Sequence, residues 1–247
     1  MKSFFFAATL LLAFSLSAQA PVAVPIPQEP HHHLVLENDY VRVFRVTVPP
    51  HEATLLHQHD VPYLYVALGP ADVINAVQGK PEAHLVMADG QLGYSPGHFA
   101  HIARNDSDLP FNNVTIELLK PQGKPENVCA QVVPGFVAPC DRSFTYKGKG
   151  YAVVPQFKTA NTELRAIRLD PNAEHVGMTV QTCSLLVALS ESHARIETKG
   201  KPAIVLGEGE VSWIEADSVV TLSNPSNKDS NLLLILLQLS GTRSPCG

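Results

Sequence analysis

The stretch that decides the fold is Val66–Pro81, which reads VALGPADVINAVQGKP. It returns as VALSESHARIETKGKP in residues 187–202, so the Val-Ala-Leu and Gly-Lys-Pro triplets recur at one shared offset. After a contraction of two residues, further pairs follow in the same order: Gly90 with Gly209, and Asn105 with Asn224. Matches that keep their order and spacing indicate a duplicated structural unit of about 80 residues.

Short runs rich in β-branched and aromatic residues surround both copies of this unit. Val41–Val48 is one such run and stops at two prolines, and Tyr63–Leu68 stops at a Gly-Pro pair. No long segment shows a helical period, and the 247 residues include 20 prolines and 15 glycines, which suits many tight turns. Because sheets of short strands close on themselves to avoid exposed edges, we expect an all-β fold of two small antiparallel β-barrels, at residues 31–120 and 161–240.

The first 20 residues are typical of a secretory signal peptide. Lys2 precedes the apolar run Phe4–Phe14, and small residues then lead to an Ala-Gln-Ala sequence. A retained membrane anchor is the alternative, but the run is shorter than the ~20 apolar residues that a spanning helix needs. Pro21 is awkward for a signal peptidase, which leaves the cleavage site open. We expect a periplasmic or secreted protein that does not contact the membrane after cleavage, with a Pro-rich spacer at residues 21–30.

Export permits disulfide bonds, and the chain has four cysteines. Cys129 and Cys140 flank a Pro/Gly-rich segment within residues 121–160, which we expect to be a linker, and they form the natural candidate pair. Closing that loop would contribute on the order of 3 kcal/mol. Cys183 lies in an apolar run and Cys246 near the end of the sequence, so their pairing stays open, and free thiols are the alternative throughout.

The overall composition excludes some classes of partner. The formal net charge is -5 and no Lys/Arg cluster is present, which argues against nucleic acid as a partner. Hydrophobic residues make up 45% of the chain and charged residues 17%, so a sizeable core can form.

Three histidines carry the candidate chemistry. His57 and His59 lie two residues apart on an expected strand, where such residues point to the same face, so both imidazoles can reach one metal ion. Downstream, a turn after Pro96 leads into a strand that would bring His101 as a third imidazole. Neutral imidazoles suit one divalent transition metal: Fe, Mn, Zn, Ni or Cu.

The other histidines are weaker candidates. The run His31–His33 could bind a metal, but we interpret it as incidental because it lies in the entry segment. His98 is an alternative ligand to His101 or an outer-sphere group. His175 and His193 are expected on the surface.

The histidine segments resemble the two sequence motifs of the cupin superfamily. The first motif places a His-x-His pair ahead of a glutamate, and His57 and His59 fit that pair. The second motif runs from a glycine through a Pro-x-Gly turn to a histidine and an asparagine, matched here by Gly90, Pro96, His101 and Asn105. The resemblance covers residues 31–120 in motif detail. It implies a double-stranded β-helix, or jelly roll, that holds a metal ion inside the barrel.

The sequence departs from these motifs at the carboxylate ligand. Where the first motif has its glutamate, the chain has Tyr63 and Leu64, and in the second motif Gly97 stands one residue early. The resemblance therefore implies a three-histidine set, like that of the three-histidine Fe(II) dioxygenases of the superfamily. Tyr63 is the candidate catalytic residue, as a hydrogen-bond or proton donor. An aromatic side chain that only fills the barrel is the alternative.

The second copy of the repeat lacks every candidate ligand. At the positions that correspond to the three histidines and the tyrosine, it has Met178, Val180, Val220 and Ser184. We interpret this unit as a structural partner of the first or as a dimerisation module.

Two classes of function remain open from the sequence. In the first, the protein is a metal-dependent enzyme of the dioxygenase or isomerase type that acts on a small molecule. In the second, it is a non-catalytic cupin protein that binds a small ligand or has a structural role. A homodimer is compatible with both.

Overall fold

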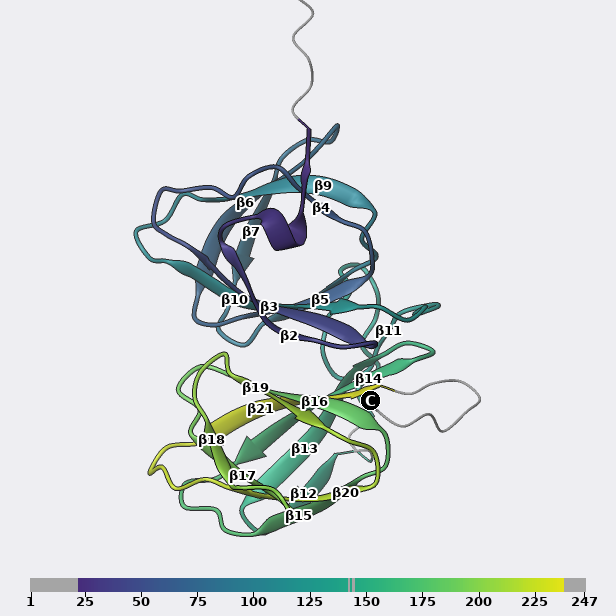
Figure 1. Ribbon diagram of the computed structural model, residues 1–247, viewed down its shortest axis with the longest axis vertical. Coiled ribbons are helices and arrows are strands. Elements are labelled where there is room, and N and C mark those ends of the chain that lie inside the picture. Colours follow the sequence, from purple (N-terminus) through teal and green to yellow (C-terminus); the bar gives the residue numbers. More distant parts are fainter. Residues whose placement is uncertain (1–21, 142, 144, 238–247) are drawn as a thin grey trace, which may run out of the picture.

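The computed structural model describes residues 22–141, 143 and 145–237, and it is built almost entirely of β-strands. Figure 1 shows two halves stacked along the long axis, the first in purple to teal and the second in green to yellow. A single turn of 3-10 helix, η1 (Ile26–Gln28), interrupts the strands near the start of the described chain. The expected all-β class is confirmed.

The first half contains two five-stranded sheets, with the orders β1-β4-β9-β6-β7 and β2-β3-β10-β5-β8. Pairing is nested: β6 lies beside β7, β5 beside β8, β4 beside β9 and β3 beside β10. Nested pairing of this kind is the pattern of a jelly roll, in which one long hairpin is rolled up so that it has two sheets. The strands are β1 (Val24–Pro25), β2 (His32–Glu37), β3 (Val41–Val48), β4 (His57–His59), β5 (Tyr63–Ala67), β6 (Ala71–Val77), β7 (Ala83–Met87), β8 (Leu92–Ser95), β9 (Phe99–Asn105) and β10 (Phe111–Leu118).

The second half repeats the nesting, with β17 beside β18, β16 beside β19, β15 beside β20 and β14 beside β21. Its sheets have the orders β11-β13-β14-β21-β16-β19, with β12 beside β13, and β15-β20-β17-β18. The strands are β11 (Glu126–Asn127), β12 (Tyr146–Gly148), β13 (Tyr151–Lys158), β14 (Thr162–Leu169), β15 (Val176–Val180), β16 (Cys183–Ala188), β17 (Ala194–Thr198), β18 (Ile204–Leu206), β19 (Val211–Ile214), β20 (Ser218–Ser223) and β21 (Ser230–Leu237).

Matching contacts show that the sequence repeat is also a structural repeat. Asn105 Nδ2 donates to three backbone carbonyl oxygens, those of Val48, Pro49 and Leu109. Its counterpart Asn224 does the same with the carbonyls of Leu169, Asp170 and Lys228. Each asparagine therefore ties the turn before β10 or β21 to the end of β3 or β14, as expected for a residue that orders a turn.

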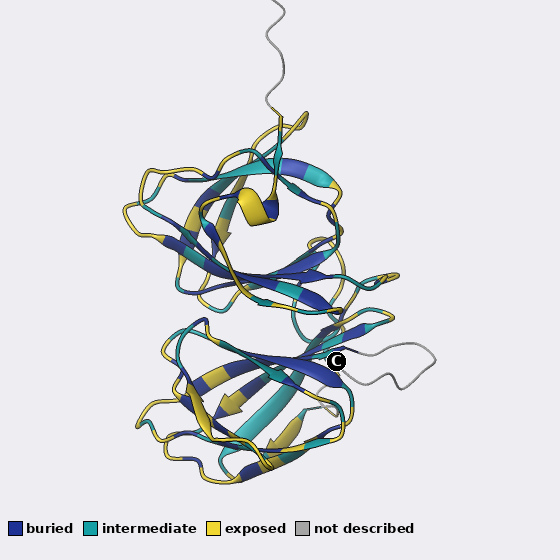
Figure 2. Cartoon of the chain, viewed as in Figure 1, coloured by how far each residue is buried: buried dark blue, intermediate teal, exposed yellow. Residues whose placement is uncertain are grey.

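Buried residues lie on strands of both halves (Figure 2), and they form apolar clusters inside each half and between the halves. The cluster between the halves joins β3, β5 and β10 of the first half to β16 and β21 of the second, with Val43, Leu64, Leu185 and Leu233 among its members. The two halves therefore pack sheet against sheet. A polar contact adds to this interface, in which Arg45 Nη1 donates to the carbonyl oxygen of Glu208 at 2.8 Å.

Two segments expected to be connections contribute to the folded halves. Residues 21–30, expected to be a spacer, contain β1 and η1, and β1 pairs in parallel with β4. Residues 121–160, expected to be a linker, contain β11, β12 and β13 of the seven-stranded sheet. The expected Cys129–Cys140 disulfide is present. Cys183 is disulfide-bonded as well, and Cys246 lies outside the described residues.

The expected signal peptide, residues 1–20, also lies outside the described residues. Within the part of the chain that the structure describes, no helix has the length and apolar character needed to cross a membrane.

Candidate metal centre

The structure brings the three sequence-predicted histidines together. His57 and His59 are buried on β4, and His101 lies directly opposite His57 on the neighbouring strand β9. The ring centroids are 4.4 Å apart for His57 and His101, 5.1 Å for His57 and His59, and 5.2 Å for His59 and His101. The His-x-His spacing explains the first two positions, and the antiparallel register explains the third.

A fourth imidazole, that of His32, joins this cluster from the other sheet. His32 is on β2, and its ring centroid lies 4.7 Å from that of His57. One nitrogen on each of His32, His57 and His59 lies within 4.8 Å of the other two, which is compatible with a shared metal ion. The interpretation of the His31–His33 run as incidental therefore does not hold for His32, whereas His33 is exposed.

The outward nitrogens of three of these rings are occupied by oxygen acceptors. The Nδ1 atoms meet the Leu55 carbonyl at 2.9 Å for His57, Asn75 Oδ1 at 2.6 Å for His101, and Glu29 Oε2 at 2.5 Å for His32. A carbonyl oxygen can only accept, so the Nδ1 of His57 carries the hydrogen and its Nε2 keeps a lone pair. Outer hydrogen bonds of this kind hold metal-binding histidines in position.

The inner nitrogens have no such partners. Nε2 of His57, Nε2 of His101 and Nδ1 of His59 are buried and lack a hydrogen-bond partner among the described residues. Orphaned polar atoms are rare in protein interiors, because losing their hydrogen bonds to water costs free energy. A cation that accepts imidazole lone pairs would satisfy them, so the residues present fit a transition metal.

Burial keeps the imidazoles of His57, His59 and His101 neutral. Burial, together with the neighbouring His32, lowers the pKa of His57 to about 3. Burial and the neighbouring histidines lower the pKa of His101 to about 2. Burial also lowers the pKa of His59, although the nearby Glu117 carboxylate opposes this change. A neutral imidazole is the form that binds metals, so the cluster is ready for a cation at neutral pH.

Two buried carboxylates, those of Glu29 and Glu117, lie next to the histidines. Glu29 is fully buried, and although burial alone would raise its pKa, hydrogen bonds from His32 and His31 lower that pKa to about 2. Glu117 on β10 is fully buried as well and forms an ion pair with Arg42, with Oε2 at 2.9 Å from Nη2. Its other oxygen lies 3.8 Å from Nδ1 of His59, which is too long for a hydrogen bond.

Tyr63 lies against the cluster. Its ring stacks on that of His59, with centroids 4.1 Å apart, and it lies opposite Glu117 in the register of β5 and β10. Burial raises the pKa of Tyr63, so its phenol stays protonated and can donate a hydrogen bond. The structure thus places Tyr63 beside a candidate ligand.

A cavity of about 90 Å³ opens onto the imidazoles between the two sheets of the first half. Apolar and uncharged polar side chains share its wall with Tyr63 and the four histidines. The remaining members of the lining are Val46, Thr54, Tyr65, Val73, Asn75, Leu85, Met87, Ala103, Phe111, Asn113 and Thr115.

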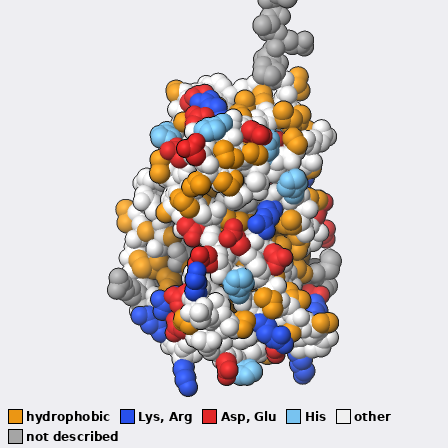
Figure 3. Space-filling model, turned by 90° about the vertical axis from the view of Figure 1, so that its left-hand side faces the viewer, with side chains coloured by type: hydrophobic (Ala, Val, Ile, Leu, Met, Phe, Trp, Pro, Cys, Tyr) orange, Lys and Arg blue, Asp and Glu red, His pale blue; other side chains and the backbone are white. Residues whose placement is uncertain are grey.

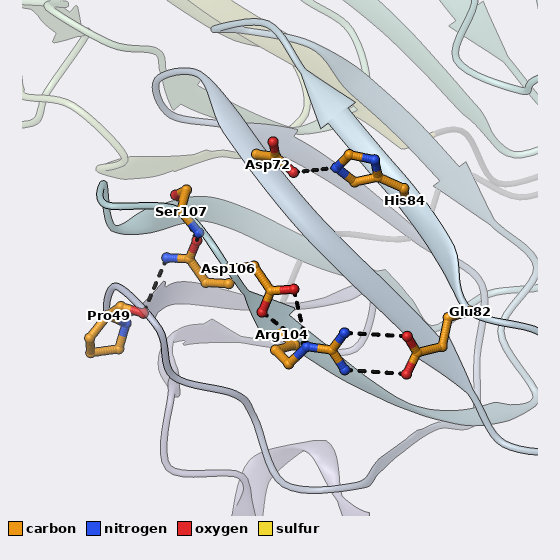
Figure 4. Close-up of polar contacts among 8 residues, drawn as sticks. Pro49, Asp72, Glu82, His84, Arg104, Asp106 and Ser107 are labelled. Atoms are coloured by element: carbon orange, nitrogen blue, oxygen red, sulfur yellow. Dashed lines mark hydrogen bonds and ion pairs between the residues drawn. The ribbon is translucent and has the colours of Figure 1, made fainter.

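Other histidines have surface roles. His98 is exposed, as are His175 and His193, and Figure 3 shows exposed histidines dispersed over one face of both halves. On the outer surface of the first half His84 pairs with Asp72 (Figure 4). Exposed pairs of this kind contribute little to stability.

The same figure shows Arg104 between Glu82 and Asp106. Its Nη1 lies 3.2 Å from Glu82 Oε1, and its Nε lies 3.0 Å from Asp106 Oδ1. These ion pairs lie on the outer surface, whereas the candidate site is inside.

No family model matches the sequence, and no curated protein matches it. Solved structures do match the fold. AerE from Microcystis aeruginosa has a TM-score of 0.58 at 14% identity, and the match covers 85% of this chain and 99% of that one. A variant of salicylate 1,2-dioxygenase from Pseudoaminobacter salicylatoxidans, in complex with gentisate, has a TM-score of 0.58 at 12% identity. That match covers 87% of this chain and 76% of the dioxygenase chain. A cupin 2 conserved barrel domain protein from Leptotrichia buccalis has a TM-score of 0.52 at 9% identity, and the match covers 84% of this chain and 88% of that one.

The chain has a cupin fold. The matches cover more of the chain than either half contains, so the likeness extends over both halves. The sequence resemblance to cupins predicted this fold correctly.

Within the cupin fold, the second half lacks the site. Met178 pairs with Val220 across β15 and β20, in the register position that His57 and His101 occupy in the first half. Val180 and Ser184 are buried at the other two positions. Apolar side chains thus replace the imidazole pair in the second half.

Proposed function

We propose that this protein is a metal-dependent enzyme of the dioxygenase type that acts on a small molecule in its first half. In this proposal His57, His59 and His101 bind one divalent transition metal, with His32 as a fourth ligand. The observation that carries the proposal is the convergence of buried imidazoles, in which His57 and His101 each have an occupied outer nitrogen and an inner nitrogen without a partner, and Nδ1 of His59 has no partner either. The dioxygenase among the structural neighbours supports the reaction class.

The residues around the imidazoles have distinct tasks in this proposal. A bound metal would act as a Lewis acid or as a site for dioxygen. Tyr63 donates a hydrogen bond from its protonated phenol. Asn75 Oδ1 orients the His101 ring through its contact with His101 Nδ1. The apolar wall around Met87 keeps bulk water away from the imidazole cluster.

The cavity indicates a small substrate. Its volume of about 90 Å³ is less than the ~150 Å³ of an engineered apolar cavity that takes up benzene. Amide and hydroxyl groups on the wall, such as those of Asn113 and Thr115, offer hydrogen bonds beside apolar side chains such as Val73. A compact molecule with one polar end fits this lining.

Elemental analysis of untagged protein tests the metal. We expect about one equivalent of a single transition metal, because one set of imidazoles converges on one point. Protein that stays metal-free in metal-replete medium would contradict the proposal. Oxygen consumption with a panel of compact substrates then tests the reaction class.

A non-catalytic protein that binds a small ligand is the second candidate. The small cavity favours it, because a cavity of this size leaves little room for a substrate beside a metal and a second reactant. Binding of a ligand without its conversion, by metal-loaded protein supplied with dioxygen, would support this alternative.

We also propose that residues 1–20 direct export. The Cys129–Cys140 disulfide supports this, because disulfides persist in oxidising compartments outside the cytosol. Fractionation of cells that express the full chain tests it: we expect a periplasmic or secreted mature form whose N-terminal sequence begins near residue 21.

A further inference from the structure

Glu29 lies in the Pro-rich segment that the sequence predicts to be a spacer, yet its side chain is fully buried. Its carboxylate accepts hydrogen bonds from the backbone N–H of His31 at 2.9 Å and from the backbone N–H of Leu55 at 3.1 Å. The same carboxylate meets Nδ1 of His31 at 2.9 Å and Nδ1 of His32 at 2.5 Å. A buried carboxylate is costly unless several donors satisfy it, and these four do so.

Two of these contacts lead to the imidazole cluster. One is direct, because Glu29 Oε2 meets the outer nitrogen of His32. The other passes through Leu55, whose N–H donates to Glu29 Oε1 and whose carbonyl oxygen accepts from Nδ1 of His57. The Glu29 carboxylate therefore contacts His32 directly and His57 through Leu55. These two imidazoles come from different sheets.

The consequence for His32 is a fixed tautomer. A carboxylate that accepts a hydrogen bond from Nδ1 requires the hydrogen on that atom, and in the neutral ring the lone pair then stays on Nε2. Such an outer-sphere carboxylate also fixes the orientation of the ring, which places Nε2 for a metal ion.

We propose that Glu29 is a positioning residue that sets the imidazoles of His32 and His57 for metal binding. It supplies, from outside the ligand set, the negative charge that the first cupin motif would supply with a glutamate and that this chain lacks at Tyr63. This inference rests on the proposed metal centre. It also makes the N-terminal segment, which pairs with β4 through β1, a working part of the site.

The chain offers a matched control in Glu52. This glutamate approaches Nε2 of the same His31, at 3.6 Å, but its side chain is 58% exposed. A substitution at Glu52 removes a carboxylate near the same histidine and leaves His32 and the Leu55 N–H untouched. Differences between Glu29→Gln and Glu52→Gln therefore report on positioning rather than on charge near the segment.

The test is a titration of the full chain, freed of metal, with Zn²⁺ and Cu²⁺. We expect Glu29→Gln to weaken Zn²⁺ binding roughly 10–100-fold, the usual cost of losing an outer-sphere partner, and Glu52→Gln to change it less than about twofold. The Cu²⁺ electron paramagnetic resonance spectrum should change in Glu29→Gln alone, because the ligand geometry changes. Glu29→Asp, which keeps the charge, should restore part of the affinity.

Nitrogen NMR of the metal-free wild-type protein reports on His32 without any substitution. We expect the neutral His32 ring, observed at alkaline pH, to carry its hydrogen on Nδ1, and a neutral ring with its hydrogen on Nε2 would overturn the inference even if Glu29→Gln fails to fold. A folded Glu29→Gln with wild-type affinity and spectrum would overturn it too, while the metal centre would stand. Wild-type protein that binds neither ion would refute the metal centre itself.

Discussion

The two halves of this molecule share a nested strand order and an asparagine that ties the same turn, but they differ in the side chains at one pair of strands. In the first half a pair of histidines faces inward across β4 and β9, and in the second half Met178 and Val220 occupy that position. The scaffold therefore does not require the imidazoles. Buried polar atoms without partners are unfavourable, and the imidazoles place such atoms in only one of the two halves. This indicates that the imidazoles have a role other than folding.

The largest expected effect removes the metal binding that distinguishes the first half from the second. His57→Ala should reduce the metal content from about one equivalent to a small fraction, because it removes a ligand rather than an outer-sphere partner, whose loss alone costs roughly 10–100-fold in affinity. The substitution at the counterpart position, Met178→Ala, should leave the metal content unchanged. Elemental analysis of both variants, with circular dichroism to confirm folding, makes the comparison. Equal metal in His57→Ala and wild type would place the metal elsewhere.

The next effect concerns what the halves share. Asn105→Ala and Asn224→Ala should each lower the free energy of unfolding by about 3 kcal/mol, because each leaves backbone carbonyls without their donor. We expect similar losses at the two positions, measured by urea denaturation of metal-free protein. A large loss at one position and none at the other would show that the repeat is not equivalent at this turn.

The dependence of stability on pH should come from the first half. The folded-state pKa of His57 is lowered from 6.5 to about 3, so between these values the unfolded chain binds a proton that the folded chain does not. Stability therefore rises with pH in this window and is lost as the pH falls below 6.5, by up to ~1.4 kcal/mol per pH unit. Denaturant titrations of metal-free protein at pH 7.5 and 4.5 measure the effect. His57→Gln should show a smaller difference between the two pH values, and an unchanged difference would assign the effect to other groups.

Local patterns and long-range pairings differ in how far the sequence predicts them. The His57-x-His59 spacing is a local pattern, and the structure places both histidines on one strand with buried side chains. His101 was found because the cupin resemblance supplied a long-range pairing.

The residues that sequence reasoning missed are those whose position depends on the packing of distant strands. His32 reaches the cluster because β2 lies at the edge of the opposite sheet, and Glu117 does so through the register of β10 with β5. Glu29 was missed because the prolines around it predicted a spacer. The three-residue spacing between Glu29 and His32 is a weak signal that could have suggested a paired carboxylate and imidazole.

The smallest expected effect tests the interface between the halves with two glycines that are repeat partners. Gly90 and Gly209 both have a positive φ, 70° and 71°, so alanine is strained at either position. A Cβ at Gly90 would lie 3.7 Å from Leu189 Cδ1, which is ordinary contact, whereas a Cβ at Gly209 would lie 2.8 Å from Leu68 Cδ1. We therefore expect Gly209→Ala to be more destabilising than Gly90→Ala by about 1 kcal/mol, because a side chain at the interface must also move. Urea denaturation of both variants measures the difference. Equal losses would mean that backbone strain alone sets the cost and that Leu68 moves aside freely.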